Sequence, residues 1–93
     1  MKSSRALSRY RKRPVIIDAV LIADLAHDDQ PAWAADAWCN CTWSWSFKDG
    51  GIDIHTREGT MHGADTDYLI KGVAGELYPC KPDIFLATYE AVE

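Results

Sequence analysis

The most regular pattern in the chain is an alternation of apolar and polar side chains over residues 41–48. The apolar positions are Cys41, Trp43, Trp45 and Phe47, and the polar ones are Thr42, Ser44, Ser46 and Lys48. A period of two is typical of a strand with one apolar face. Asp49-Gly50-Gly51 follows as a turn and residues 52–56 alternate again, so the two runs are predicted to form an antiparallel hairpin.

Four more short strands are expected around this hairpin. The β-branched run Val15–Ile22 is short and apolar, which favours a mostly buried strand over a helix. Residues 60–62 and 68–71 are the next two. Residues 76–79 form the last, and Pro79 restricts it to an edge or an end of a sheet because proline has no N–H to donate.

Two short helices complete the predicted fold. One covers residues 31–38 with Asp29 as its cap, the other covers residues 82–89, and each has a proline in its first turn (Pro31 and Pro82). The chain is therefore expected to be a single small α+β domain. Its predicted architecture is a meandering antiparallel sheet with one or two short helices packed on one face.

Composition adds a folded core and a charge asymmetry to this picture. The 93 residues are enough for one hydrophobic core, and the Trp, Tyr and Phe side chains supply much of its apolar area. Six of the ten basic residues lie within residues 1–13, where no acid occurs, whereas residues 14–93 hold fourteen acids and four bases. The net charge of −4 thus divides into +6 for an N-terminal arm at 1–13 and −10 for a domain at 14–93.

The basic arm has two interpretations. Arg9, Arg11, Lys12 and Arg13 are candidates for contacting nucleic-acid phosphates, in a salt-sensitive and sequence-independent way. The alternative is a flexible solubilising tail, or one that folds back on the acids of the domain. The acidic domain favours this alternative, because it repels a phosphate backbone.

The compartment is inferred from the apolar runs and the cysteines. No run approaches the roughly 18 residues of a membrane span, because Asp18 and Asp24 interrupt the longest one, Val15–Ala26. No small-residue cleavage site follows that run, so it is not interpreted as part of a signal peptide. The three cysteines are an odd number, which fits a reducing compartment. We therefore expect a cytoplasmic protein without a membrane partner.

The cysteines are also weak candidates for a metal site. Cys39, Cys41 and Cys80, together with His55 and His62, contain the ligand types of tetrahedral zinc. The Cys-x-Cys spacing is not that of a usual zinc pair, so small buried hydrophobes are the favoured interpretation. No cofactor is expected.

Catalytic patterns are equally sparse. Glu58, Asp65, Asp67 and Glu76 flank turns, where solvated acids are far commoner than an acid–base pair. The segment 72–75 is too short for a phosphate-binding loop and has no following Lys-Ser or Lys-Thr pair. We therefore expect no enzymatic activity.

The tryptophan-rich strand leaves one question open. If a helix covers its apolar face, Trp43, Trp45 and Phe47 belong to the core, which is the favoured interpretation. If part of that face is uncovered, it is a protein-binding patch with a tryptophan anchor. The residues predicted to bind a partner are these three aromatics with Asp65 and Asp67, and their acidic surroundings favour a basic partner.

Two segments resemble a widespread family of small tailed-phage and prophage proteins. They are YRKRPVIIDAV at residues 10–20 and DYLIKGVAGELYPCKPDIF at residues 67–85, the latter followed by Thr88-Tyr89-Glu90. The C-terminal match is specific because many consecutive positions agree. Family members usually carry a Pro-Gly-Asp turn where this chain has Asp65-Thr66-Asp67, and the tryptophan-rich middle lies outside the family pattern.

The resemblance implies a phage or prophage origin, a small α+β fold and no assigned reaction. The leading hypothesis is a non-enzymatic accessory protein, in the cytoplasm of an infected bacterium, that binds a host or phage protein or associates with itself. One alternative is a small-ligand or nucleotide binder that counters host defence, with a pocket lined by Trp and Tyr. The other is nucleic-acid binding through the basic arm.

Overall fold

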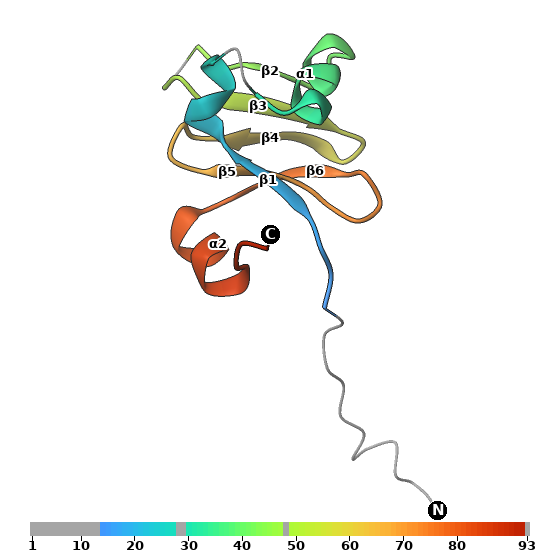
Figure 1. Cartoon of the computed structure of the whole chain (residues 1–93). Helices are drawn as coiled ribbons and strands as arrows, with labels where there is room; N and C mark the ends of the chain where they lie inside the picture. Colours follow the sequence, from blue (N-terminus) through green and yellow to red (C-terminus); the bar gives the residue numbers. More distant parts are fainter. Residues whose placement is uncertain (1–13, 28–29, 48, 93) are drawn as a thin grey trace, which may run out of the picture.

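The computed structural model describes residues 14–27, 30–47 and 49–92 (Figure 1). In chain order the elements are β1 (Asp18–Leu21), the 3₁₀ helix η2 (Ile22–Ala26), α1 (Ala32–Cys39), β2 (Trp43–Trp45), β3 (Ile52–Thr56), β4 (Gly59–Gly63), β5 (Tyr68–Lys71), β6 (Leu77–Cys80) and α2 (Pro82–Thr88). The predicted α+β class is confirmed. The arm with its candidates Arg9, Arg11, Lys12 and Arg13 lies outside the described residues, as does the expected cap Asp29.

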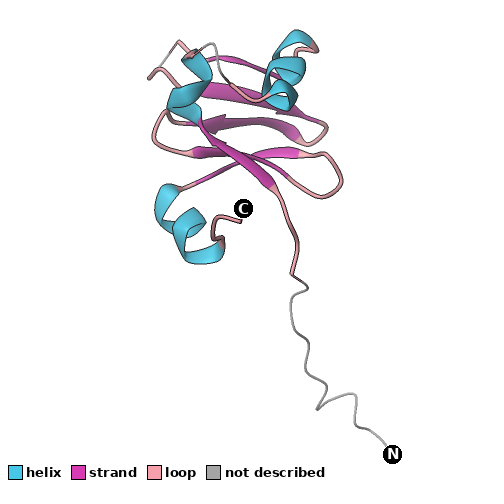
Figure 2. Cartoon of the chain, in the orientation of Figure 1, coloured by secondary structure: helices cyan, strands magenta, loops and turns pink. Residues whose placement is uncertain are grey.

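The strands form two antiparallel three-stranded sheets, with orders β2-β3-β4 and β1-β5-β6. The predicted hairpin is confirmed, with Trp43 opposite Ile54 and Trp45 opposite Ile52. Strand β6, which contains Pro79, lies at a sheet edge as expected. Figure 2 shows the strands in the middle of the molecule, with η2 and α1 at one end and α2 at the other.

The chain passes from one sheet to the other at Gly63, where the sheets approach closely. A Cβ atom at Gly63 would lie 2.6 Å from Cδ1 of Ile22 and 3.2 Å from Cβ of Pro79. Only glycine leaves room for this approach without displacing a neighbour. The single meander expected from the sequence is therefore divided into two sheets that pack on a common core.

The first strand is shorter than the run Val15–Ile22 suggested. Within this run only Asp18–Leu21 pairs with β5, from Asp18 opposite Lys71 to Leu21 opposite Tyr68. Residues 14–17 have no partner in β5, because β5 ends at Lys71. Val15 and Ile16 are consequently exposed. At the other end, Ile22 starts η2 and turns its buried side chain into the core.

The core lies between the two sheets, beneath η2 and α1. Its buried members are Ile22, Leu25, Ala34, Trp43, Ile52, Ile54, Leu69 and Leu77, with Val20, Trp33 and Ala37 packed against them. All are apolar and come from η2, α1 and five of the strands, so the burial that stabilises the fold joins segments far apart in sequence. No helix within the described ranges is long and apolar enough to cross a membrane.

Helix α2 packs against the opposite face of the β1-β5-β6 sheet through aromatic contacts. The Phe85 ring stacks on Tyr68 with centroids 4.0 Å apart and lies 5.4 Å from Tyr89. Burial, followed by a hydrogen bond with Tyr89, raises the pKa of Tyr78 to about 12. No residue of α2 is fully buried, so this helix is held by few contacts.

Candidate functional site

The tryptophan-rich strand is neither wholly core nor wholly surface. Trp43 is 1% exposed, Trp45 is 38% exposed and Phe47 is fully exposed. The indole N–H of Trp43 donates to the carbonyl of Ala34 in α1 at 2.9 Å, so this helix covers the strand at Trp43. Strand β2 ends at Trp45, and Phe47 lies in the turn beyond it, where neither sheet nor helix backs the side chain.

Two exposed tryptophans lie at the junction of α1 and β2, and the exposed Phe47 follows β2 in the chain. Trp38, from the last turn of α1, is 51% exposed and its ring centroid lies 6.5 Å from that of Trp43. Trp45 meets Trp43 edge to face at 5.1 Å. We call Trp38, Trp45 and Phe47 the aromatic surface; buried Trp43 supports its two tryptophans. Trp38 was not among the predicted binding residues, because that prediction took its aromatic side chains only from the predicted strand.

The two predicted binding acids have different environments. Asp65 is exposed, whereas Asp67 is only 3% exposed. The Asp67 carboxylate accepts the N–H of Ala64 at 3.0 Å and lies 3.6 Å from the Lys81 ammonium group. Asp67 therefore stabilises the turn between β4 and β5. The sequence predicted that Asp67 binds a partner, but its carboxylate is buried within its own turn.

The cysteines do not converge on one point. Cys39 and Cys41 are exposed, contrary to the expectation of small buried hydrophobes, and Cys80 is half-buried in β6. Cys41 is not in the predicted strand but has a φ of 63°, in the turn that follows α1. Among the described residues, no three His, Cys, Asp or Glu side chains are grouped to hold a metal ion.

The thiol of Cys80 is poorly suited to nucleophilic chemistry. Burial raises its pKa above the ordinary value, and the carboxylates of Asp67 and Asp83 raise it further. Because the thiolate is the reactive form, a raised pKa lowers reactivity near neutral pH. This agrees with the interpretation of Cys80 as a packing residue.

The outer face of the β2-β3-β4 sheet carries two histidines with different partners. His55 lies 3.0 Å from the Ser44 hydroxyl and 3.4 Å from that of Thr60. A serine hydrogen-bonded to a histidine supplies two members of a catalytic triad, whose third member is a carboxylate. In this chain the second partner of His55 is the neutral hydroxyl of Thr60. All three side chains lie on an open sheet face, so we assign this group no catalytic role.

His62 bridges two carboxylates on the same face. Its Nδ1 lies 3.0 Å from Asp53 and its Nε2 lies 3.0 Å from Asp49, which also accepts the N–H of Gly51. The hydrogen bond with Asp53, then that with Asp49, raises the pKa of His62. The protonated ring thus ties strand β4 to strand β3 and to the turn at Asp49.

We expect this bridge to contribute stability at low pH and not at high pH. The pKa of His62 is higher in the folded chain than its ordinary value of about 6.5. Its contribution is therefore complete below about pH 6.5 and is lost as the pH rises through the folded pKa. At pH 6 the free energy of unfolding of the wild-type chain should exceed that of His62→Gln by less than about 1 kcal/mol, because the ring is partly exposed. At pH 9 the two free energies should be equal.

An NMR titration of the His62 ring tests the cause of this pKa shift. The pKa of His62 should fall towards the ordinary value in Asp53→Asn and to a smaller extent in Asp49→Asn. A wild-type pKa at or below about 6.5 would contradict the bridge.

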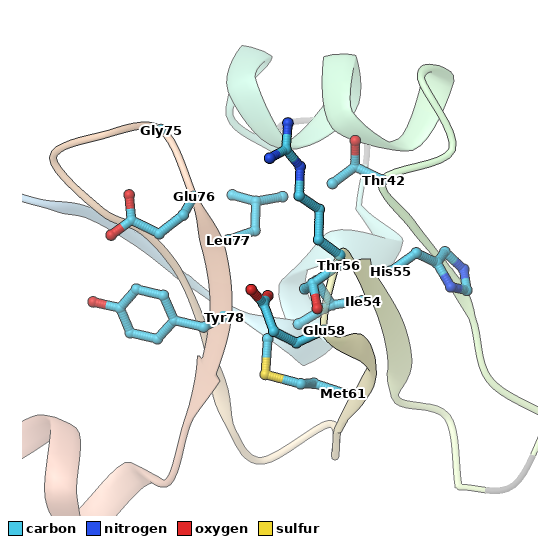
Figure 3. Close-up of a pocket in the computed structure, with 11 residues that line it drawn as sticks. Thr42, Ile54, His55, Thr56, Glu58, Met61, Gly75, Glu76, Leu77 and Tyr78 are labelled. Carbon is cyan, nitrogen blue, oxygen red and sulfur yellow. The ribbon is translucent and has the colours of Figure 1, made fainter.

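A cavity of about 460 Å³ opens between the β3–β4 hairpin and strand β6 (Figure 3). Its apolar lining comes from Ile54, Met61 and Leu77, and charged residues including Glu58 and Glu76 also line it. Tyr78 is the one aromatic residue in this lining. The pocket lined by Trp and Tyr that the ligand-binding alternative requires is therefore not formed here.

The aromatic surface combines three exposed aromatic side chains, and no group of three metal-ligating side chains occurs in the part of the chain that the structure describes. Comparison with known proteins neither adds to nor changes this assignment. No protein-family model, no curated protein and no solved structure matches this chain.

Proposed function

We propose that this chain is a non-enzymatic phage or prophage accessory protein that binds a host or phage protein through the aromatic surface. The observation that carries the proposal is the exposure of Trp38 and Trp45 on either side of buried Trp43, with fully exposed Phe47 in the turn after β2. Aromatic side chains supply large contact areas at low entropic cost and are enriched among residues that dominate binding energy. The proposed phage origin is supported by the resemblance of residues 10–20 and 67–85.

The charge distribution favours a basic partner. Residues 14–93 carry fourteen acids and four bases, a balance of −10. The segments that carry the aromatic surface also contain exposed acids, with Asp36 on the same helix as Trp38 and Asp49 two residues after Phe47. Complementary charge around an apolar centre accelerates association and excludes acidic competitors.

Cross-linking inside infected host cells is the direct test. A photoreactive p-benzoylphenylalanine placed at Phe47 should form a cross-link to one discrete protein. The matched control is the same residue at Val73, which is 70% exposed in the turn between β5 and β6. Equal cross-linking from both positions would contradict the proposal. If position 47 forms cross-links only between copies of this chain, the aromatic surface serves self-association and not the binding of another protein.

Once that partner is purified, truncation of the aromatic surface should weaken binding. The double variant Trp38→Ala/Phe47→Ala is expected to raise the Kd by about 30-fold or more, which corresponds to the loss of one strong anchor. Val73→Ala should leave the Kd unchanged. Isothermal titration calorimetry provides the measurement, and near-wild-type affinity of the double variant would exclude the aromatic surface as the binding site.

The two alternatives retain different support. For the small-ligand alternative there is an open cavity beside Tyr78, but its lining lacks the tryptophans that this alternative requires. Nucleic-acid binding rests on Arg9, Arg11, Lys12 and Arg13, which lie outside the described residues, and it stays a prediction.

A further inference from the structure

Helix α1 ends in a pair of exposed cysteines that the proposed function does not use. Cys39 is the last residue of the helix and Cys41 lies in the turn that follows it, and both thiols are free and exposed. The third cysteine, Cys80, is half-buried in β6. The end of α1 therefore offers two sulfur atoms to a ligand, on residues that are separated by one position in the chain.

Two hydrogen bonds hold the turn that carries this pair. The N–H of Cys41 donates to the carbonyl of Trp38 at 3.0 Å, and the N–H of Thr42 donates to the carbonyl of Ala37 at 2.8 Å. These are the two bonds of the Schellman motif, a common end of a helix. The backbone between the cysteines is thus ordered before a ligand arrives, which lowers the entropic cost of binding.

Cysteine is an unusual residue at position 41. Its φ is 63°, and within the ranges that the structure describes it is the only residue other than glycine with a positive φ. This position of the motif is usually glycine, because a Cβ atom is strained in the left-handed region. Backbone strain of this kind is concentrated at functional positions. The group that Cys41 has and glycine lacks is the thiol.

The number and softness of these donors indicate the class of ligand. Thiolates favour soft cations such as Cu(I) and Zn²⁺. Structural zinc takes four protein ligands, whereas no three His, Cys, Asp or Glu side chains among residues 14–27, 30–47 and 49–92 are grouped to hold a metal ion. Cu(I) needs only two thiolates, because this monovalent d¹⁰ cation forms stable linear complexes with them.

We propose that Cys39 and Cys41 together bind one Cu(I) ion between their sulfur atoms. Helical geometry places Cα atoms two residues apart at about 5.5 Å, and two sulfurs on a linear cation lie about 4–5 Å apart, twice the length of a metal–sulfur bond. Side-chain rotation at two exposed residues brings the sulfurs to this separation. Each thiol releases its proton to solvent as it binds the ion. Copper stays Cu(I), so no oxidant or reductant takes part.

Native mass spectrometry of the full chain with Cu(I) alone tests the proposal, in the absence of oxygen and of thiol reductants. The wild type should bind one ion per chain. Competition with bathocuproine disulfonate measures the affinity, which should fall by about 100-fold or more in Cys39→Ser and in Cys41→Ser, because a chelate needs both sulfurs. Cys80→Ser is the matched control and should bind as tightly as the wild type. All three variants should fold normally by circular dichroism.

Three results would overturn the proposal. They are a wild type that binds no ion, single variants that keep the wild-type affinity as independent thiols would, and an ion that joins two chains. Cys41→Gly gives a second readout without metal, since glycine removes the strain and should raise the Tm by about 4 °C. A lower Tm in this variant would contradict the assignment of position 41 as a strained ligand position. These measurements need no partner protein, so their failure leaves the proposed function untouched.

Discussion

Replacing Trp43 by alanine is expected to lower the free energy of unfolding by about 3–5 kcal/mol, the range for truncation of a large buried aromatic side chain. Trp43 is 1% exposed, packs with Ile54 across the hairpin and donates its indole N–H to Ala34. Truncation leaves a cavity between β2 and α1 and removes the hydrogen bond that joins them. For a domain of this size the loss is a large part of a total stability of about 5–15 kcal/mol.

Urea denaturation followed by far-ultraviolet circular dichroism measures this effect. Phe47→Ala is the matched control, since Phe47 belongs to the same predicted aromatic face but is fully exposed, and its change should stay within about 0.5 kcal/mol. The loss of unfolding free energy in Trp43→Phe should lie between those of Trp43→Ala and Phe47→Ala, because phenylalanine keeps much of the packing but cannot donate the hydrogen bond to Ala34. Equal effects of Trp43→Ala and Phe47→Ala would contradict the division of this strand into core and surface.

Replacing Asp67 by alanine should lower the free energy of unfolding by about 1.5–3 kcal/mol, the contribution of a hydrogen bond to a charged group. Its carboxylate accepts the N–H of Ala64 and is almost fully buried, while Lys81, its ion-pair partner, is mostly exposed. We assign most of the effect to the hydrogen bond with Ala64, because an ion pair with one solvated partner contributes little.

Two variants separate these contributions in the same denaturation assay. Asp67→Asn keeps an oxygen acceptor for Ala64 and should lose less than half as much stability as Asp67→Ala. Asp65→Ala, two residues earlier and exposed, should change stability by less than about 0.5 kcal/mol. If Asp65→Ala and Asp67→Ala behave alike, Asp67 is not the structural acid of this turn.

Local pattern was sufficient for much of the secondary structure. The alternation over 41–48 and 52–56 predicted the β2–β3 hairpin and the glycine turn between them, and the registers confirm this pairing. Strand β5 and the starts of both helices were also predicted to within a residue. These features depend on the period of apolar residues and on proline and glycine geometry, which operate within a few neighbouring positions.

The lengths of the strands could not be predicted in the same way. The apolar run Val15–Ile22 continues on both sides of β1, but β5 offers only four residues for pairing, so Ile16 is exposed and Ile22 begins a 3₁₀ helix. Cys41 likewise fits the alternation, yet the turn after α1 gives it a φ of 63°. A strand ends where its partner ends, and that partner is distant in sequence.

The candidate sites show the same division. The sequence alone determined that Trp43 and Trp45 share one face of a strand and that Asp65 and Asp67 lie in a turn. Only the tertiary structure decided that α1 covers Trp43 and leaves Phe47 exposed, that Trp38 joins the aromatic surface, and that Asp67 is buried beneath its turn. The physical reason is that periodicity specifies the direction of a side chain, whereas burial depends on which distant segment packs over it.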